Sequence, residues 1–379
     1  MTQYVFLGHD VDWRKQGASL EHIMARKERF EPAVLEECDK KNPYYNIPDY
    51  MEIEEKFGVK STYFFRTKYE DGDLADYEDD IRSLIDGGWE VGLHLDPSSI
   101  DDTKKILEEK NSEAAQQGKD VMQMINNSPH YKEAVPEEGL VTATEEFTSQ
   151  PDGNTIKIQY IRPDSDETLP CIYYIHGGGM MVSSCFDELY AAWGRCIARQ
   201  GVAVAMVDFR NCMWASSAPE VAPFPAGLND CVSGIKWVHE NSDDLNIDKE
   251  QIVIAGESGG GNLTLATGLK LNQDGDIGIV KGLYALCPYI AGYWPLPENP
   301  SSEENEGILL SLHSETNKSF GAIIYGIEEY HNKNPLAWPS FASVEDVKGL
   351  PKTYIIVNEC DPLRDEGVNF YRMLREADV

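Results

Sequence analysis

The stretch from Ile252 to Gly261 constrains the fold of this chain more than any other. Its first four residues are apolar and run directly into Gly256-Glu257-Ser258-Gly259-Gly260, and an amphipathic segment follows over 262–271. This pattern predicts a strand, a sharp turn and a helix, with Ser258 in a strained backbone conformation that the flanking glycines permit. Gly-x-Ser-x-Gly also occurs in plain strand-to-helix turns, so other motifs must decide whether Ser258 has a chemical role.

Other apolar stretches also read as strands that end in polar or glycine-rich loops. The stretch 171–175 ends at His176-Gly177-Gly178-Gly179, the stretch 202–207 ends at Asp208, and the stretch 353–357 ends shortly before Asp361. Helical patterns separate these strands, which favours an α/β class with a mostly parallel sheet. We expect Ser258 to lie close to the glycine loop that follows 171–175.

The glycine loop and Asp361 suit the chemistry of an attacking serine. An ester carbonyl attacked by a hydroxyl becomes a tetrahedral oxyanion. Its stabilisation requires backbone N–H donors that are not already hydrogen-bonded to another group. Glycines after a sheet strand let the backbone approach a ligand closely, so the loop provides such donors. Asp361 follows a strand that comes after the Ser258 turn in the chain. This agrees with the chain order Ser, Asp, His of the α/β-hydrolase fold. Its alternative role is an ordinary loop aspartate or helix cap.

Residues 112–379 resemble the hormone-sensitive-lipase family of α/β-hydrolases, the bacterial family IV esterases. The resemblance is carried by five motifs in the family's order, namely His176-Gly177-Gly178-Gly179, Asp208-Phe209-Arg210, Phe224-Pro225-Ala226 with Asp230, Gly256-Glu257-Ser258-Gly259-Gly260 and Asp361-Pro362-Leu363-Arg364-Asp365-Glu366. It implies the α/β-hydrolase fold with helices on both sheet faces and a cap insertion about 288–350.

The same resemblance implies hydrolysis of small carboxylic esters with short-to-medium acyl chains, without a cofactor. Ser258 would be the nucleophile and Asp361 would orient the base. The N–H groups of Gly178, Gly179 and Gly259 would form the oxyanion hole. His176 would orient its loop rather than act as a base, and the stretch 208–210 would shape the loop below the site.

The catalytic histidine that follows the aspartate in this family has no counterpart in this sequence. The eight histidines are His9, His22, His94, His130, His176, His239, His313 and His331, and all of them precede Asp361. Only 18 residues follow Asp361, so we expect the hydrolase domain, 140–379, to be C-terminally incomplete and weak or inactive as an esterase. His313 and His331, in the expected cap, stay candidates for a substitute base. Loss of an edge strand would also expose the hydrogen-bonding groups of its neighbour and invite association.

The first segment, 1–111, has a different pattern and resembles the N-terminal part of a polysaccharide deacetylase domain. Strand, helix, strand, helix, strand suggests a partial β/α-barrel-like segment. By this resemblance Asp12 would be a metal ligand, Asp10 a base and His94 the first histidine of a His-x-x-x-His pair. The fourth residue after His94 is Ser98, so the second histidine is absent and we expect no complete metal site. Residues 112–139 are expected to be a linker or partial N-terminal cap.

Composition limits the partners and the compartment. The formal net charge is -32, which disfavours nucleic acid and anionic membrane surfaces. The eight cysteines include no Cys-x-x-Cys pair, which indicates reduced thiols in a cytoplasmic protein. Homo-oligomer formation stays open. Three hypotheses follow, which are a serine esterase with an incomplete triad, a metal-dependent carbohydrate deacetylase, and a non-catalytic fusion of two partial domains.

Overall fold

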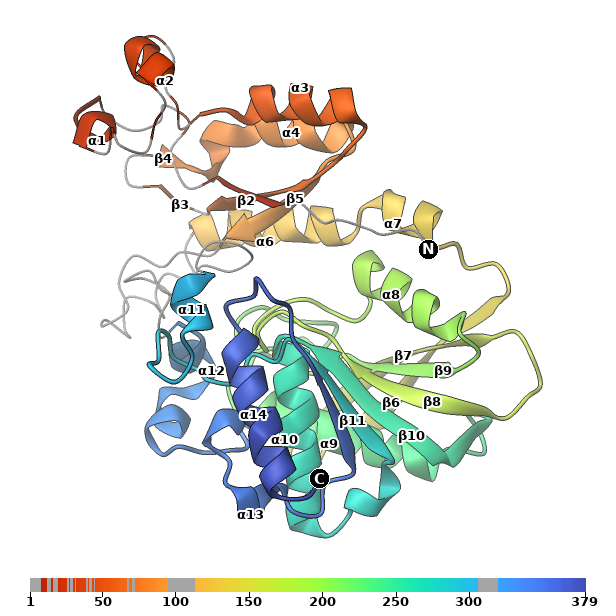
Figure 1. The fold of residues 1–379 in the computed structure, drawn as a ribbon. Helices are drawn as coiled ribbons and strands as arrows, with labels where there is room; N and C mark the ends of the chain where they lie inside the picture. Colours follow the sequence, from red (N-terminus) through yellow and green to blue (C-terminus); the bar gives the residue numbers. More distant parts are fainter. Residues whose placement is uncertain are drawn as a thin grey trace. The chain divides into compact units, whose positions relative to one another are not determined.

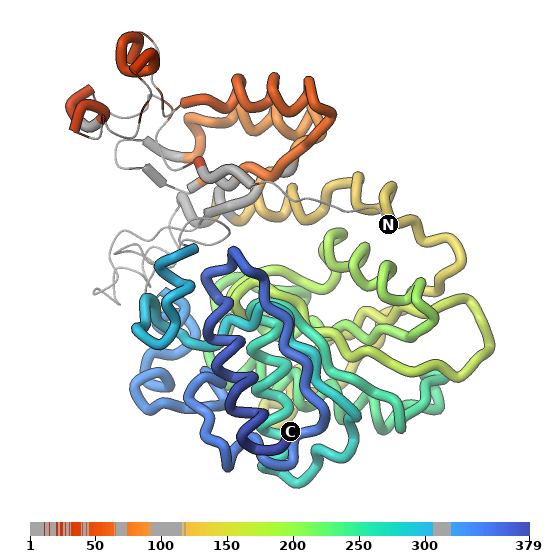
Figure 2. The backbone as a smooth tube through the Cα atoms, in the orientation of Figure 1, coloured from red at the N-terminus to blue at the C-terminus, as the bar shows by residue number. Residues whose placement is uncertain are grey.

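The computed structural model describes residues 8–11, 15, 20–25, 27, 30, 32–38, 40, 43, 45–66, 68–69, 72–94, 113–305 and 320–379. These residues belong to two compact units. The first holds the described residues up to 94 together with 113–125, and the second holds the remainder from Asn126 onward. Figures 1 and 2 draw the backbone of both units, coloured from red at the N-terminus to blue at the C-terminus.

The first unit is built on a parallel three-stranded sheet in the order β1 (Gly8–Val11), β2 (Thr62–Arg66), β5 (Glu90–His94). Its longer helices are α3 (Ile47–Phe57) and α4 (Glu78–Asp86). The smaller elements are α1 (Leu20–Ala25), α2 (Pro32–Glu37), β3 (Lys68–Tyr69), β4 (Gly72–Asp73) and η2 (Leu74–Tyr77). The parallel strand order therefore agrees with the pattern in the sequence, although three strands do not make a barrel.

Helix α6 (Glu113–Asn126) belongs largely to this first unit. The sequence predicts a linker or partial N-terminal cap over 112–139. In the structure, Val121 and Ile125 of α6 pack against the apolar core that contains Tyr63, Phe65 and Leu84. Residues four apart share one face of a helix, so an amphipathic segment can dock even where its overall composition is polar.

The second unit is built on a seven-stranded sheet in the order β12-β11-β10-β8-β9-β7-β6. The strands are β6 (Leu140–Thr148), β7 (Thr155–Pro163), β8 (Leu169–Ile175), β9 (Ala203–Val207), β10 (Ile247–Glu257), β11 (Gly282–Leu286) and β12 (Lys352–Ile356). β7 runs antiparallel to β6 and β9, and the other neighbours are parallel. The carboxyl ends of β8, β9, β10, β11 and β12 therefore lie along one edge of the sheet.

Helices cover the two faces of this sheet unequally. One face carries α9 (Ala226–Glu240), α10 (Gly259–Asp274) and α14 (Arg364–Glu376), while α8 (Glu188–Ala198) lies on the other, over β7, β9 and β8 (Figure 1). The remaining helices are α7 (Pro129–Ala134), η3 (Ile277–Ile279), α11 (Ser301–Glu304), α12 (Phe320–His331), η4 (Pro339–Phe341) and α13 (Val344–Val347). α12 lies in the stretch 288–350, where the sequence shows no long periodic pattern, and it contains a kink at Gly326.

Two further observations bear on the composition. Within the described parts of the chain, no helix is both long and apolar enough to cross a bilayer. All eight cysteines are free, and Cys171, Cys185, Cys212 and Cys231 are buried. Cys360 is exposed, next to Asp361.

Candidate active site

Ser258 lies at a strained turn between β10 and α10. Its backbone has φ 56° and ψ -118°, a conformation that non-glycine residues rarely adopt. The N–H of Ser258 donates to the carbonyl of Leu286 at 2.9 Å, and its own carbonyl accepts from the N–H groups of Asn262 and Tyr289, both at 3.0 Å. These bonds to a neighbouring strand end, to α10 and to the loop after β11 hold the turn, and the residue is only half-buried. The side chain is therefore presented at the edge where the parallel strands end.

The glycine loop after β8 packs directly against this turn. A Cβ added to Gly259 would lie 2.6 Å from the backbone nitrogens of both Gly179 and Met180, and one added to Gly260 would lie 2.0 Å from the carbonyl oxygen of Ile175. Only glycine fits at such distances. Gly178 and Gly179 have φ values of 96° and 64°, in the left-handed region that favours glycine. The structure thus brings Gly178, Gly179, Ser258 and Gly259 together, as expected from the sequence.

Glu257, the residue before Ser258, ties the turn to the glycine loop. Its Oε1 accepts from the N–H of Gly177 at 2.7 Å and from the hydroxyl of Tyr190 at 2.9 Å, and its Oε2 accepts from the hydroxyl of Tyr174. Removal of the carboxyl group from water raises its pKa, which these donors oppose. Sequence reasoning assigned no role to Glu257, because the variable position of Gly-x-Ser-x-Gly carries no contact information.

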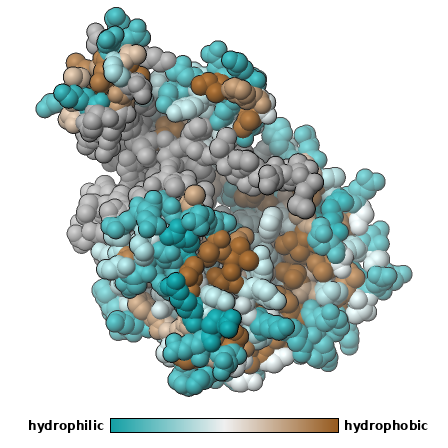
Figure 3. All heavy atoms as spheres, in the orientation of Figure 1, coloured by the Kyte–Doolittle hydropathy of each residue, from teal (hydrophilic) through white to brown (hydrophobic). Residues whose placement is uncertain are grey.

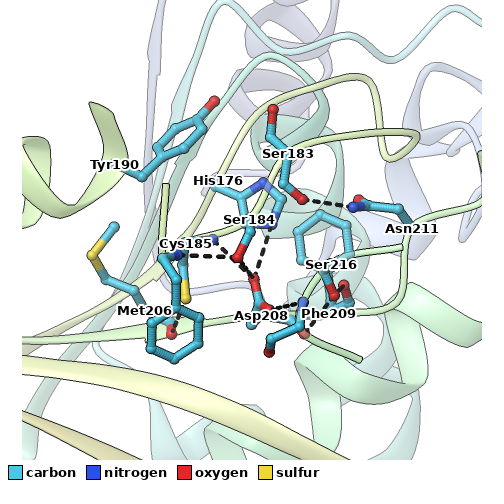
Figure 4. A network of polar contacts seen from close by, with 12 residues as sticks. His176, Ser183, Ser184, Cys185, Tyr190, Met206, Asp208, Phe209, Asn211 and Ser216 are labelled. Carbon is cyan, nitrogen blue, oxygen red and sulfur yellow. Dashed lines mark hydrogen bonds and ion pairs between the residues drawn. The ribbon is translucent and has the colours of Figure 1, made fainter. Parts of the chain in front are cut away.

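Asp208, at the carboxyl end of β9, organises the loops below the glycine loop (Figure 4). Its carboxylate accepts from the hydroxyl of Ser184 at 2.7 Å and from the N–H groups of Cys185 and Ser217 at 2.9 and 2.6 Å. It is fully buried, so this carboxylate fixes two separate loops on one strand end. The position agrees with the shaping role that the family resemblance implies for 208–210.

His176 is also fully buried and lies apart from bulk solvent. Its ring stacks on Phe209 with 4.4 Å between centroids, its Nδ1 lies 2.8 Å from the carbonyl of Gly177, and its Nε2 lies 3.9 Å from Asp208 (Figure 4). Burial lowers its pKa, against the opposing effect of the Asp208 charge. These contacts suit a residue that orients the glycine loop.

Arg210 and Asp230 form a buried ion pair that anchors α9 to this part of the site. Arg210 donates to both carboxylate oxygens of Asp230 at 2.9 Å and also to Asp152 at 2.7 Å. Ser149 donates to Asp230 at 2.6 Å. Because Asp230 is fully buried, its charge depends on this set of donors.

Asp361 follows β12 and lies 3% exposed in the loop before α14. Its carboxylate accepts from the N–H of Leu363 at 2.9 Å, and burial raises its pKa. Cys287, directly after β11, is within electrostatic reach of Asp361. The pKa of its thiol is raised to about 12, first by burial and then by the Asp361 charge, while the N–H of Ser258 opposes the shift. Asp361 and Ser258 therefore both lie beside the end of β11.

Glu366 is a further buried carboxylate, which sequence reasoning used only as part of a motif. It accepts from the N–H groups of Ile290 at 2.7 Å and Ala291 at 3.4 Å and from the indole of Trp294 at 2.8 Å. Burial raises its pKa to about 8. The loop that Glu366 holds includes Tyr289, whose N–H donates to the carbonyl of Ser258. Glu366 therefore stabilises the Ser258 turn through this loop.

Among the histidines whose side chains the structure describes, none is hydrogen-bonded to Ser258 or Asp361. His176 is buried beside Asp208, His130 pairs with Glu133 at 3.5 Å, and His331 is exposed at the end of α12. His239 lies half-buried near the end of α9. His313 lies outside the described residues, as do the side chains of the other three.

The candidate residues of the first segment are only partly within the described structure. His9 and Asp10 lie in β1 and His94 ends β5, but their side chains, and all of Asp12, are outside it. Val11 and Leu93 both pair with Phe65 of β2, so β1 and β5 end at one edge with β2 between them. Over the described part of the chain there is no group of three or more metal-ligating side chains. A metal role for Asp12 and His94 stays a prediction.

The mixed sheet, the strained serine between β10 and α10 and the interlocked glycine loop define an α/β-hydrolase. The chain belongs to this family, since a family model described as the alpha/beta hydrolase fold matches residues 172–379. The sequence-based expectation of an α/β-hydrolase is confirmed for this part of the chain.

Its curated relatives and solved neighbours include several esterases. An arylesterase of Saccharolobus solfataricus is 31% identical over 209 residues, covering 55% of this chain and 63% of the relative. The carboxylesterase NlhH of Mycobacterium tuberculosis is 31% identical over 222 residues, covering 58% and 65%. The matched part of the chain thus spans less than two thirds of the length of these relatives.

Two solved structures are also similar to this chain. Esterase Est22 is 56% identical with a TM-score of 0.71, covering 74% of this chain and 83% of Est22. Brefeldin A esterase, described as a bacterial homologue of human hormone sensitive lipase, is 33% identical with a TM-score of 0.66, covering 79% and 81%. These similarities support the resemblance to the hormone-sensitive-lipase family.

Proposed function

We propose that this chain is a carboxylic ester hydrolase in which Ser258 is the nucleophile. The observation that carries the proposal is the close approach of Gly259 to Gly179, which places the Ser258 turn directly against the backbone N–H groups of the glycine loop. The relatives and neighbours reported above are named as esterases, which supports the same class of reaction.

In the proposed reaction, the hydroxyl of Ser258 gives up its proton as its Oγ forms a bond to the ester carbonyl carbon, and the carbonyl electron pair moves onto the carbonyl oxygen. This released proton balances the one that the leaving alcohol takes up. The N–H groups of Gly178, Gly179 and Gly259 then donate to this oxyanion. The intermediate collapses, the bond to the alcohol oxygen breaks, and the alcohol takes up a proton. Water attacks the resulting acyl-serine in the same way and releases the carboxylic acid.

The proton transfers set the expected rate. Serine is a weak nucleophile without a base in hydrogen-bond reach, and the same base must protonate the leaving alcohol. Asp361 would orient that base, but no histidine follows it in these 379 residues. Loss of the triad histidine lowers kcat on the order of a million-fold in a serine protease, while the oxyanion hole keeps roughly a thousand-fold over water. We therefore expect slow turnover by this chain.

Turnover of p-nitrophenyl acetate by the 379-residue chain tests this proposal, with Ser258→Ala as the variant. The matched control is Ser165→Ala, because Ser165 is exposed and its hydrogen bonds to Arg162 and Pro163 use backbone atoms, which the substitution keeps. We expect slow release of p-nitrophenol that Ser258→Ala abolishes and Ser165→Ala leaves unchanged. Release that persists in Ser258→Ala would rule out the nucleophile. Fast, Ser258-dependent release would show that a base is present, and His313→Ala and His331→Ala would identify it.

A further inference from the structure

A cavity of about 560 Å³ lies in the first unit between α4 and α6, and all of its described lining residues belong to that unit. Its apolar lining is supplied by Leu74, Ile81, Ile85, Val121 and Met124. Small-molecule sites have volumes of about 300–1,000 Å³ and are mostly apolar. This cavity, which we call the α4–α6 groove, therefore has the size and the lining of a ligand site.

The groove forms because two helices dock on the same core. Ile81 of α4 belongs to the core of the first unit, while Ile85 of α4 and Val121 of α6 pack against that core. Residues three or four apart share one face of a helix, so Ile81 and Ile85 line the groove from α4, and Val121 and Met124 line it from α6. Met124 is 48% exposed, and its unbranched thioether side chain can adapt to a bound molecule.

The concave shape, rather than exposed apolar surface alone, distinguishes this place. Figure 3 shows hydrophobic and hydrophilic residues interspersed on the visible face of the first unit. Apolar residues scattered singly are normal on a protein surface, whereas apolar residues gathered around a cavity and rimmed by polar groups indicate binding.

The rim of the groove is acidic. Its charged residues are Glu78, Arg82, Asp86 and Asp120. Arg82 donates to Glu78 through Nε at 3.1 Å and Nη2 at 2.6 Å, so these two charges offset each other. Asp120 accepts from the neutral amide of Gln116 at 2.9 Å, which leaves its charge uncompensated. Among the described residues no cation forms an ion pair with Asp86 or Asp120, although Arg82 is within electrostatic reach of Asp86.

We propose that the α4–α6 groove binds a small primary amine that carries an apolar alkyl or aryl chain. The chain would lie against Ile81, Ile85 and Met124. The ammonium group would lie at the acidic rim and donate to Asp86 or Asp120, which its compact charge and three donors suit. Charge complementarity therefore selects the cation, and the apolar lining selects the chain.

The charge of the protein opposes the alternative of an anionic amphiphile such as a fatty acid. The rim holds three carboxylates and one guanidinium, and the whole chain has a formal net charge of -32. A carboxylate ligand would therefore be repelled both at the rim and at longer range. Salt would screen this difference, because the screening length falls from about 10 Å at 0.1 M to about 3 Å at 1 M.

Methyl NMR of the full chain, titrated with n-octylammonium chloride, n-octanol or sodium octanoate, locates and ranks the binding. We expect octylammonium to shift the methyl resonances of Ile81, Ile85 and Met124, with an affinity roughly two- to fivefold above that of octanol. Octanoate should bind more weakly than octanol, and the preference for octylammonium should shrink in 1 M NaCl. Any other ranking of the three probes would overturn the proposal. So would the absence of shifts, or shifts confined to the second unit, for example at Ile254.

Two pairs of variants test the two parts of the groove. Met124→Lys places an ammonium group on a four-carbon stem in the groove and should abolish octylammonium binding. Gln123→Lys is its matched control, because Gln123 is exposed on α6 outside the lining. Asp86→Asn should weaken octylammonium roughly two- to fivefold and leave octanol unchanged. Asp79→Asn, exposed on α4 outside the lining, should change neither.

The comparison within each pair decides the outcome. Octylammonium binding by Met124→Lys as tight as by Gln123→Lys would show that the molecule does not occupy the groove. An effect of Asp86→Asn no larger than that of Asp79→Asn would refute the contact with the rim, unless Asp120→Asn gives the two- to fivefold loss instead. Because Met124, Asp86 and Asp120 are all exposed, these substitutions leave the core of the first unit intact.

Discussion

The contacts of Glu257 lead to a prediction about both stability and catalysis. Three donors converge on its carboxylate, namely the N–H of Gly177 and the hydroxyls of Tyr174 and Tyr190. Glu257→Ala leaves all three without their acceptor. An unsatisfied donor costs about 1–3 kcal/mol, and because this site is partly buried we take the low end, about 3 kcal/mol for the three.

Glu257→Gln separates hydrogen bonding from charge. Its amide oxygen can keep the two donors that Oε1 now accepts, and its amide NH₂ can donate to Tyr174, whose hydroxyl rotates to accept. We expect Glu257→Gln to lie within about 1 kcal/mol of the wild-type chain at pH 7. Where turnover is measurable, Glu257→Ala should lower kcat more than it raises KM, since the proposed oxyanion hole would act on the transition state.

The pH dependence supplies a second readout for this residue. Burial raises the pKa of Glu257 in the folded chain, so the folded state retains a proton that the unfolded state releases. Its contribution to the free energy of unfolding therefore falls as the pH rises above the unfolded pKa, which is about 4.3. Glu257→Gln should remove that decline.

Urea unfolding of the second unit, followed by tryptophan fluorescence from pH 4 to pH 8, measures both effects. Glu250→Gln is a suitable control, because Glu250 is exposed on the same strand and pairs only with Lys281. A Glu257→Ala variant as stable as the wild-type chain would refute the reasoning. So would a Glu257→Gln variant as unstable as Glu257→Ala, because a lost charge alone would then explain the effect.

Three other substitutions have defined outcomes. Gly259→Ala puts a Cβ 2.6 Å from two amide nitrogens and should destabilise the chain by about 1–3 kcal/mol, unlike Gly278→Ala, where nothing lies within 4 Å. Glu366→Gln should flatten the loss of stability between about pH 5 and pH 8, roughly 1.4 kcal/mol per pH unit, because the folded pKa of Glu366 is raised to about 8. Arg210→Met should cost about 3–5 kcal/mol by leaving buried Asp230 unpaired.

Each of these has its own check by urea unfolding. Equal stability of Gly259→Ala and Gly278→Ala would contradict the first prediction, because the Ser258 turn and the glycine loop would then move apart at little cost. Glu376→Gln, an exposed change on α14, controls for Glu366 and should leave the pH slope intact. Arg372→Met controls for Arg210, because Arg372 is exposed and donates only to Asn369. A cost for Arg210→Met no larger than for Arg372→Met would contradict the buried ion pair.

Much of the second unit could be predicted because its signals are local. The strand before Ser258, the glycines around it and the helix after it are neighbours in sequence, and their φ requirements depend on residue type alone. β6 (Leu140–Thr148) was expected over the same residues because its polar and apolar residues alternate. α12 was missed because the stretch 288–350 is rich in aromatic residues and proline and its helix is kinked at Gly326, so no regular period appears.

The sequence by itself thus determined the class of fold, the serine turn and the glycine loop. Tertiary structure decided which groups Glu257 holds, since Tyr174, Tyr190 and Gly177 lie 67 to 83 residues away. The register of β10 with β8 brings Tyr174 and Gly177 to it, and the packing of α8 brings Tyr190. It also decided that Tyr354 and Ile356 are exposed, because α14 packs against the face of β12 that carries Ile355, and the sequence alone does not say which face a helix covers. Local patterns fix backbone conformation, whereas contacts between distant residues depend on how strands pair and which faces helices cover.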